Sequence, residues 1–140
     1  MGIDLDVVRN KLATIERCIG RIDEEYKGSP ATLKNYTKQD AIVLNLQRAC
    51  EAAIDIAMHC CAKNKLGVPQ ESRNAFEFLS EKGIIPASLS QTLKGMVGFR
   101  NIAVHDYKSI NLDILQAIIE KHLDELVEFG RLILKAELDS

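Results

Sequence analysis

The chain has 140 residues, of which 46% are hydrophobic and 27% charged, and its formal net charge is −2 at pH 7. This length and balance predict one globular domain, residues 1–140, with enough chain to bury a core. The slight excess of acid argues against a broadly cationic nucleic-acid surface, although a local basic cleft is compatible with it. Few glycines and prolines, with only 5% aromatic residues, favour helices over a β-sandwich or barrel.

The N-terminus and the cysteines indicate a cytoplasmic protein. The first eight residues, MGIDLDVV, show no basic segment followed by an apolar run, so we expect no secretory leader. No apolar run is long enough to span a bilayer. None of the cysteines is paired in a C-x-x-C motif, and we expect buried free thiols rather than metal ligands or disulfides: these are Cys18, Cys50, Cys60 and Cys61.

Two long helices occupy the first half of the chain. Apolar residues recur at steps of three and four over residues 4–26, and the sequence KGSP at 27–30 then ends the helix. Thr37 is expected to cap a second helix that extends to about Lys63. Apolar residues surround most of this second helix, so we predict that it is the central helix of a bundle.

The second half predicts two further main helices and one short one. Ser72 is expected to cap a short helix that ends at residues 82–83, and Ser88 or Ser90 to begin the next one. That helix continues into a polar stretch near residue 100, and residues 107–111 form a break.

The last helix is expected over residues 112–136, capped by Asn111, with Leu123 and Phe129 at the margin of its apolar stripe. Together these elements predict an all-α protein, an up-and-down bundle of four main helices plus a short fifth helix.

The polar stretch at residues 100–107 reads RNIAVHDY and gathers four chemically useful side chains: Arg100, Asn101, His105 and Tyr107. Asn101 and His105 stack on one helix face at i and i+4, and Arg100 and Tyr107 stack at i and i+7. Arg100 and His105, however, project about 140° apart on a straight helix. Their convergence requires the helix to end or bend near Ala103, or a second copy of the motif across a dimer axis.

These residue types suit cleavage of a phosphodiester without a metal or cofactor. His105 could take the proton of a ribose 2′-OH, and Arg100 could hold the phosphate with two hydrogen bonds. Asn101 could fix the imidazole tautomer, and Tyr107 could bind the phosphate or be modified. Structural roles remain open: His105 as a helix cap, Arg100 paired with acidic residues, and Tyr107 as a turn anchor.

Acidic residues on the second helix offer a possible support for the motif. Glu51 and Asp55 are like charges at i and i+4, and Arg48 could be the cation between them. Alternatively, Glu51 or Asp55 reaches Arg100 and orients it. His59 and His122 have no nearby ligand residues, so we interpret them as surface or boundary residues.

The stretch at residues 100–107 fits the pattern Arg, four residues, His, any residue, Tyr, which resembles the signature of HEPN-domain toxins of the HepT type. The second-helix stretch LQRACEAAIDIA at residues 46–57 is also similar to that family. So are LGVP at residues 66–69 and the pair Ser72-Arg73. The resemblance therefore covers nearly the whole chain.

This resemblance implies a helical homodimer in which the motifs of both subunits face one cleft, and a metal-independent endoribonuclease that cleaves tRNA or mRNA. It implies that Arg100 and His105 are catalytic and that Asn101 supports them. It also implies a minimal nucleotidyltransferase antitoxin that transfers AMP from ATP to Tyr107. We expect Lys94 and Lys108 to add positive charge to the cleft.

A different function is compatible with the same residues. The chain could be a non-catalytic helical dimer that binds a nucleotide or a nucleotidyltransferase partner, because Arg and His also bind phosphate without cleaving it. A purely structural helical bundle is the third alternative.

Overall fold

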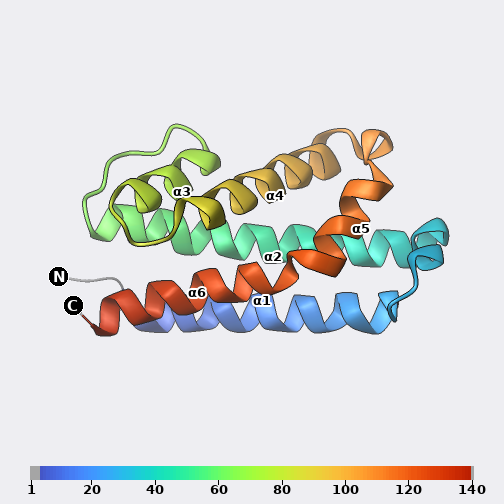
Figure 1. Ribbon diagram of the computed structural model, residues 1–140, viewed down its shortest axis with the longest axis horizontal. Helices are drawn as coiled ribbons and strands as arrows, with labels where there is room; N and C mark the ends of the chain where they lie inside the picture. The colour runs from blue at the N-terminus through green and yellow to red at the C-terminus, as the bar shows by residue number, and fades with distance from the viewer. Residues whose placement is uncertain (1–3, 140) are drawn as a thin grey trace.

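The computed structural model describes residues 4–139 of the chain, and within them it contains helices and no strand. The elements are α1 (Leu5–Tyr26), η1 (Pro30–Lys34), α2 (Tyr36–Lys63), α3 (Ser72–Glu81), α4 (Ala87–His105), η2 (Tyr107–Ser109), α5 (Leu112–Lys121) and α6 (Leu123–Leu138). The long helices lie side by side, with α3 and α4 along one side of α2, α1 and α6 along the other, and α5 crossing between them (Figure 1). The predicted all-α bundle is confirmed.

Helix α2 is the centre of this bundle, as the sequence predicts. It contacts α1, α3, α4 and α6, and apolar side chains are buried on several of its sides. Its small residues let neighbouring helices approach closely, among them Ala49, Ala53 and Ala57, each at most 1% exposed. The core of the protein is therefore continuous along α2 and fixes where the ends of α4 lie.

Three helix starts differ from the prediction. Asn35, not Thr37, caps α2, because its side chain accepts a hydrogen bond from the Lys38 N–H. Glu71, not Ser72, precedes α3, where it forms a capping box with Asn74.

Helix α4 begins at Ala87, directly after Pro86, and therefore earlier than either serine that we expected to cap it. The ring of proline fixes φ, and proline has no backbone N–H. Because an N–H at the start of a helix has no partner within the helix, proline suits this position. Pro86 supplies no side-chain hydrogen bond, and the first turn of α4 starts without a side-chain cap.

The predicted last helix is two helices, α5 and α6, which meet at His122. His122 leaves the helical conformation, with φ −128° and ψ −5°, and its Nδ1 lies 2.6 Å from Glu125 Oε1. The break rotates the apolar stripe, so Leu123 and Phe129 lie in the core instead of at its margin. Phe129 packs edge-on against Phe76 of α3, with ring centroids 5.3 Å apart.

Helix α4 runs to His105 without the bend that we considered near Ala103. The Asp106 N–H still donates to the Ile102 carbonyl at 2.8 Å, and only then does the chain leave the helix. The predicted break after the motif is confirmed, since Tyr107 begins the short helix η2. Tyr107 therefore does not stack on Arg100 along one helix.

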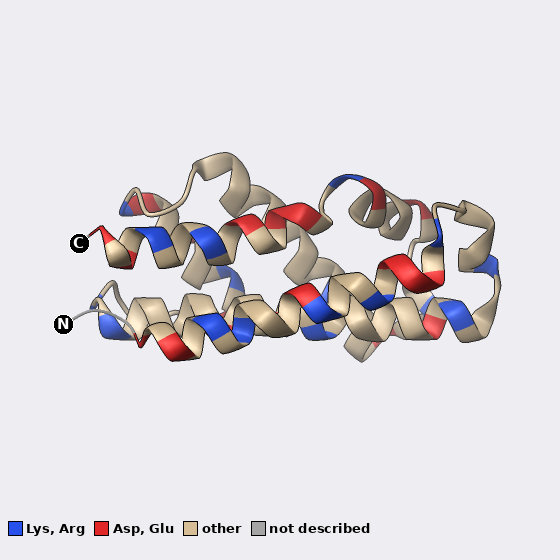
Figure 2. Cartoon of the chain, turned by 90° about the horizontal axis from the view of Figure 1, so that it is seen from below, with Lys and Arg blue, Asp and Glu red and all other residues tan. Residues whose placement is uncertain are grey.

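The surface charge is mixed. Along α1 and α6, basic and acidic residues alternate on the face shown in Figure 2, which is not a continuous cationic surface. None of the helices within residues 4–139 has the length and apolar character that a membrane crossing requires. The leader expectation rests partly on residues 1–3, which lie outside the described residues.

Candidate functional site

Arg100 lies half-buried in the last two turns of α4, beside a cleft of about 280 Å³. The cleft lies between α4 and the start of α3, and its lining residues are Glu71, Ser72, Arg73, Val97, Arg100 and Asn101. Among residues 4–139, Arg100 Nε is the buried side-chain polar atom that has no hydrogen-bond partner. A buried donor left unpaired costs free energy, so this guanidinium is ready to accept an anionic partner.

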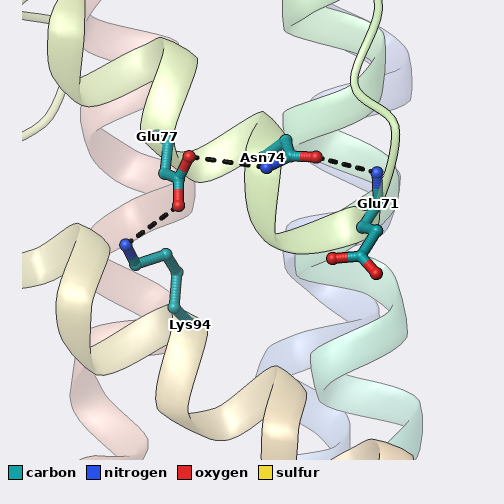
Figure 3. Close-up of polar contacts among 4 residues, drawn as sticks. All are labelled: Glu71, Asn74, Glu77 and Lys94. Atoms are coloured by element: carbon teal, nitrogen blue, oxygen red, sulfur yellow. Dashed lines mark hydrogen bonds and ion pairs between the residues drawn. The ribbon is translucent and has the colours of Figure 1, made fainter.

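A chain of polar contacts fixes the α3 side of this cleft (Figure 3). Lys94 of α4 forms a 3.1 Å ion pair with Glu77, whose other oxygen accepts a hydrogen bond from Asn74. The side-chain oxygen of Asn74, Oδ1, in turn accepts a 3.0 Å hydrogen bond from the Glu71 backbone N–H. Lys94 also holds the pKa of Glu77 below its usual value, mainly through this hydrogen bond. Within the protomer, Lys94 is therefore paired with an acidic residue, and Arg73 is a further cation that lines the cleft.

His105 is the last residue of α4 and is exposed to solvent. It is not among the residues that line the Arg100 cleft, whereas Asn101 is. Within residues 4–139 no hydrogen bond connects Asn101 to the imidazole, so the protomer alone does not fix the tautomer in this way. The straight helix keeps Arg100 and His105 apart, as the helical geometry predicts for one chain.

Tyr107 folds back from η2 onto the start of α2. Its hydroxyl donates a 2.5 Å hydrogen bond to Asp40 Oδ1 and lies 3.3 Å from Gln39 Oε1. Partial burial raises the pKa of Tyr107, and the hydrogen bond and negative charge of Asp40 raise it further. Tyr107 as a whole is 37% exposed, so the residue is both anchored and within reach from solvent.

The structure does not bring Asp55 to Arg100. The Asp55 carboxylate forms a 3.0 Å ion pair with Lys11 of α1, which also means that Arg48 is not the cation beside it. Glu51 accepts a long 3.5 Å hydrogen bond from Gln47. Within the described residues, no ion pair connects Glu51 with Arg100.

The four cysteines are free and buried, as expected. Burial raises the pKa of the Cys50 thiol to about 12, although the nearby Arg100 acts in the opposite direction. Among residues 4–139, no group of three or more His, Cys, Asp or Glu side chains is placed to hold a metal ion.

The remaining two histidines are boundary residues. His59 Nε2 accepts the Asp4 N–H at 3.1 Å and so ties the start of α1 to the end of α2. His122 is half-buried and pairs with Glu125 at the α5–α6 break. Neither lies at the motif.

Sequence reasoning missed the residues that surround the motif. Asp40 and Gln39 contact Tyr107 from 67 and 68 positions away in the chain, and Arg73 lines the Arg100 cleft from α3. The pair Ser72-Arg73 stood out in the sequence, but nothing in its spacing indicated that α3 would pack beside Arg100.

The chain is similar to proteins of established activity over nearly its whole length. Residues 15–133 match the family described as ribonuclease HepT-like. The chain is 48% identical over 132 residues to the mRNA nuclease HepT of Shewanella oneidensis, which covers 94% of this chain and 98% of that protein.

Solved structures agree with this relationship. One is a tri-AMPylated Shewanella oneidensis HEPN toxin in complex with an MNT antitoxin, 49% identical, covering 94% of this chain and 98% of that chain with a TM-score of 0.87. Another is a toxin–antitoxin complex with AMP-PNP, 47% identical over 91% of this chain and 98% of that one, with a TM-score of 0.85. The helical arrangement, the Arg–His–Tyr motif and these matches lead to one conclusion: the chain belongs to the ribonuclease HepT-like family.

Proposed function

We propose that this protein is the toxin of a toxin–antitoxin pair, an endoribonuclease that cleaves tRNA or mRNA in the cytoplasm without a metal ion. The observation that carries the proposal is the 48% identity of this chain, over 94% of its length, to an mRNA nuclease. The end of α4 and the start of η2 add the chemistry, because α4 presents an imidazole and a guanidinium with an unpaired buried Nε, and η2 presents a phenol.

In this mechanism His105 accepts the proton of a ribose 2′-OH while that oxygen attacks the adjacent phosphorus. The bond from phosphorus to the 5′-oxygen of the next nucleotide breaks, this oxygen takes a proton from water, and a 2′,3′-cyclic phosphate remains on the other fragment. Arg100 binds the phosphate and stabilises the negative charge that develops on its oxygens. Asn101, in the same cleft as Arg100, supports the site.

The catalytic site is proposed to form between two copies of the chain. Because α4 is straight, Arg100 and His105 of one chain diverge, and a twofold axis can bring Arg100 of one subunit to His105 of the other. The contacts Tyr107–Asp40 and Cys50–Met96 set the register of the antiparallel helices α4 and α2.

This register places Leu44 of α2 level with Ile102 and Val104 of α4. All three are exposed large apolar side chains, between 43% and 44% accessible. An exposed apolar group beside a polar motif is typical of a surface that a partner covers. We assign this surface to the homodimer contact.

The proposed control is AMP transfer from ATP to Tyr107 by a minimal nucleotidyltransferase antitoxin. One similar complex contains a tri-AMPylated toxin with its MNT antitoxin, and another contains AMP-PNP. An AMP group on Tyr107 would add negative charge and a bulky nucleotide two residues from His105, and would repel and block the RNA. The exposed part of Tyr107 leaves room for this reaction.

The proposal is tested with purified protein, chelator and labelled RNA, before and after incubation with the antitoxin and ATP. We expect cleavage by the wild type, loss of cleavage in His105→Ala, and loss after Tyr107 is modified. Cleavage that survives His105→Ala would overturn the catalytic assignment. Tight nucleotide binding without any cleavage would favour a non-catalytic binding dimer.

A further inference from the structure

The contact between Tyr107 and Asp40 has a chemical use that an anchoring role does not require. The Tyr107 hydroxyl donates a direct 2.5 Å hydrogen bond to the carboxylate of Asp40 on α2. Asp40 is the fifth residue of α2 and is exposed to solvent. Its side chain forms no other hydrogen bond or ion pair within the described residues. The carboxylate is therefore free to act on the phenol alone.

The second acceptor, Gln39, is fixed in place and cannot take a proton. Its Nε2 donates to the Leu33 carbonyl at 2.8 Å, which leaves Oε1 facing the Tyr107 hydroxyl at 3.3 Å. Gln39 is buried at 8% exposure, so its orientation is well determined. Gln39 thus orients the phenol, whereas Asp40 is the basic group on it.

Three other charged residues near Tyr107 belong to its own segment, and a fourth, Lys38, lies on α2. His105 and Lys108 are exposed neighbours in the chain, and Asp106 accepts a 2.6 Å hydrogen bond from Ser109. None of them forms a hydrogen bond with the Tyr107 hydroxyl within residues 4–139. Lys38 of α2, two residues before Asp40, forms an ion pair with Glu25 at 3.7 Å.

A phenol that accepts a nucleotide must lose its proton. Burial and the Asp40 charge raise the pKa of Tyr107, so free phenolate is scarcer at neutral pH than for an ordinary tyrosine. A nucleophile with such a pKa requires a base that takes the proton during the attack.

We propose that Asp40 of the toxin is a catalytic residue in the modification of Tyr107 of the same chain. Its carboxylate accepts the Tyr107 phenol proton as the phenol oxygen attacks the α-phosphorus of a nucleoside triphosphate. This inference rests on the proposed function, in which the antitoxin holds the nucleotide. The O–H bond of Tyr107 breaks and a bond from its oxygen to the α-phosphorus forms. The bond from this phosphorus to the bridging oxygen breaks, diphosphate leaves with the electron pair, and Asp40 later releases the proton to water.

The experiment measures the initial rate at which labelled AMP from ATP is incorporated into the full-length toxin by its antitoxin, between pH 6 and pH 9. The variant Asp40→Asn keeps an acceptor oxygen for the phenol but removes the base. Glu128→Gln, which removes an exposed carboxylate from α6, is the charge control, and Tyr107→Phe identifies the acceptor. The circular dichroism spectrum and the urea midpoint of each unmodified protein show that it is folded.

We expect Asp40→Asn to incorporate AMP at least about 100-fold more slowly at neutral pH. Its rate should rise with pH as hydroxide replaces the missing base, whereas the wild-type rate changes little. An Asp40→Asn rate within about twofold of wild type, or a loss of equal size at every pH, would overturn the inference. Wild-type toxin that gains no AMP on Tyr107 would overturn the proposed control itself, a result distinct from normal modification of Asp40→Asn.

Discussion

Arg100 and His105 lie five residues apart on one uninterrupted helix, α4, and their side chains therefore leave it about 140° apart. Arg100 enters the cleft beside α3, while His105 ends the helix in solvent. One protomer thus carries both groups without joining them. This separation is why the proposed site requires a second copy of the chain.

The two-pronged binding of phosphate by Arg100 can be tested separately from its charge. Arg100→Lys keeps the cation but loses the planar pair of donors, and we expect kcat/KM for RNA to fall about 10- to 100-fold. Arg100→Ala should cost about 10²- to 10³-fold, as when a group that stabilises transition-state charge is removed. Equal activity of wild type and Arg100→Lys would show that only the charge matters.

Two glycines provide a matched test of the packing of α1 against its neighbours. A Cβ on Gly130 of α6 would lie 2.7 Å from Leu12 Cδ1 of α1, so Gly130→Ala should lose about 1–3 kcal/mol to this clash, partly offset by the helix propensity of alanine. Gly20 has open space within α1, and Gly20→Ala should raise the free energy of unfolding by about 0.5–1 kcal/mol. Urea denaturation measures both, and a Gly130→Ala protein that gains as much stability as Gly20→Ala would contradict this close approach of α1 and α6.

The ion pair between Lys94 and Glu77 should matter more than an ordinary surface pair, because it continues into the contacts that hold the start of α3. We expect Lys94→Met to lower the urea midpoint and to reduce ribonuclease activity, since α3 carries part of the Arg100 cleft. Lys38→Met, which removes a 3.7 Å pair with Glu25, is the matched control and should change neither much. Equal effects of the two variants would show that the network has no special role.

The buried thiols predict a loss of stability at alkaline pH. Burial raises the pKa of Cys50 to about 12 and of Cys60 to about 11, from 9.0. Groups whose folded pKa is raised stabilise the protein fully below their unfolded pKa, and this contribution is lost as the pH rises from about 9 to 11. The urea midpoint should therefore fall over this range, and less steeply in Cys60→Ala. The native protein should also resist a thiol reagent at pH 8 and react with it in denaturant.

Much of the fold is visible in the sequence, because the apolar periodicity of α1 and α2 and the strong stop after Tyr26 are local signals. The break at His122 is not, since helical periodicity continues through it and no proline or glycine marks it. Its cause is tertiary: Tyr26 at the end of α1 donates a short hydrogen bond to Glu120 of α5, while α6 buries Leu123 and Phe129.

The site shows the same division between local and distant signals. The spacing of Arg100, His105 and Tyr107 predicted both the motif and its divergence on one helix. Asp40 and Arg73 could not be found in this way, because each reaches the motif from another helix. Partners of this kind are defined by the packing of α2 and α3 against α4.

In the proposed dimer, each active site takes Arg100 from one subunit and His105 from the other. Arg100→Ala and His105→Ala toxins, each inactive alone, are unfolded together, refolded as a mixture and assayed for RNA cleavage. Mixed dimers then contain one intact site, and we expect recovery to about a quarter of wild-type activity for random pairing. A mixture that forms mixed dimers and stays as inactive as its two components would contradict the shared site.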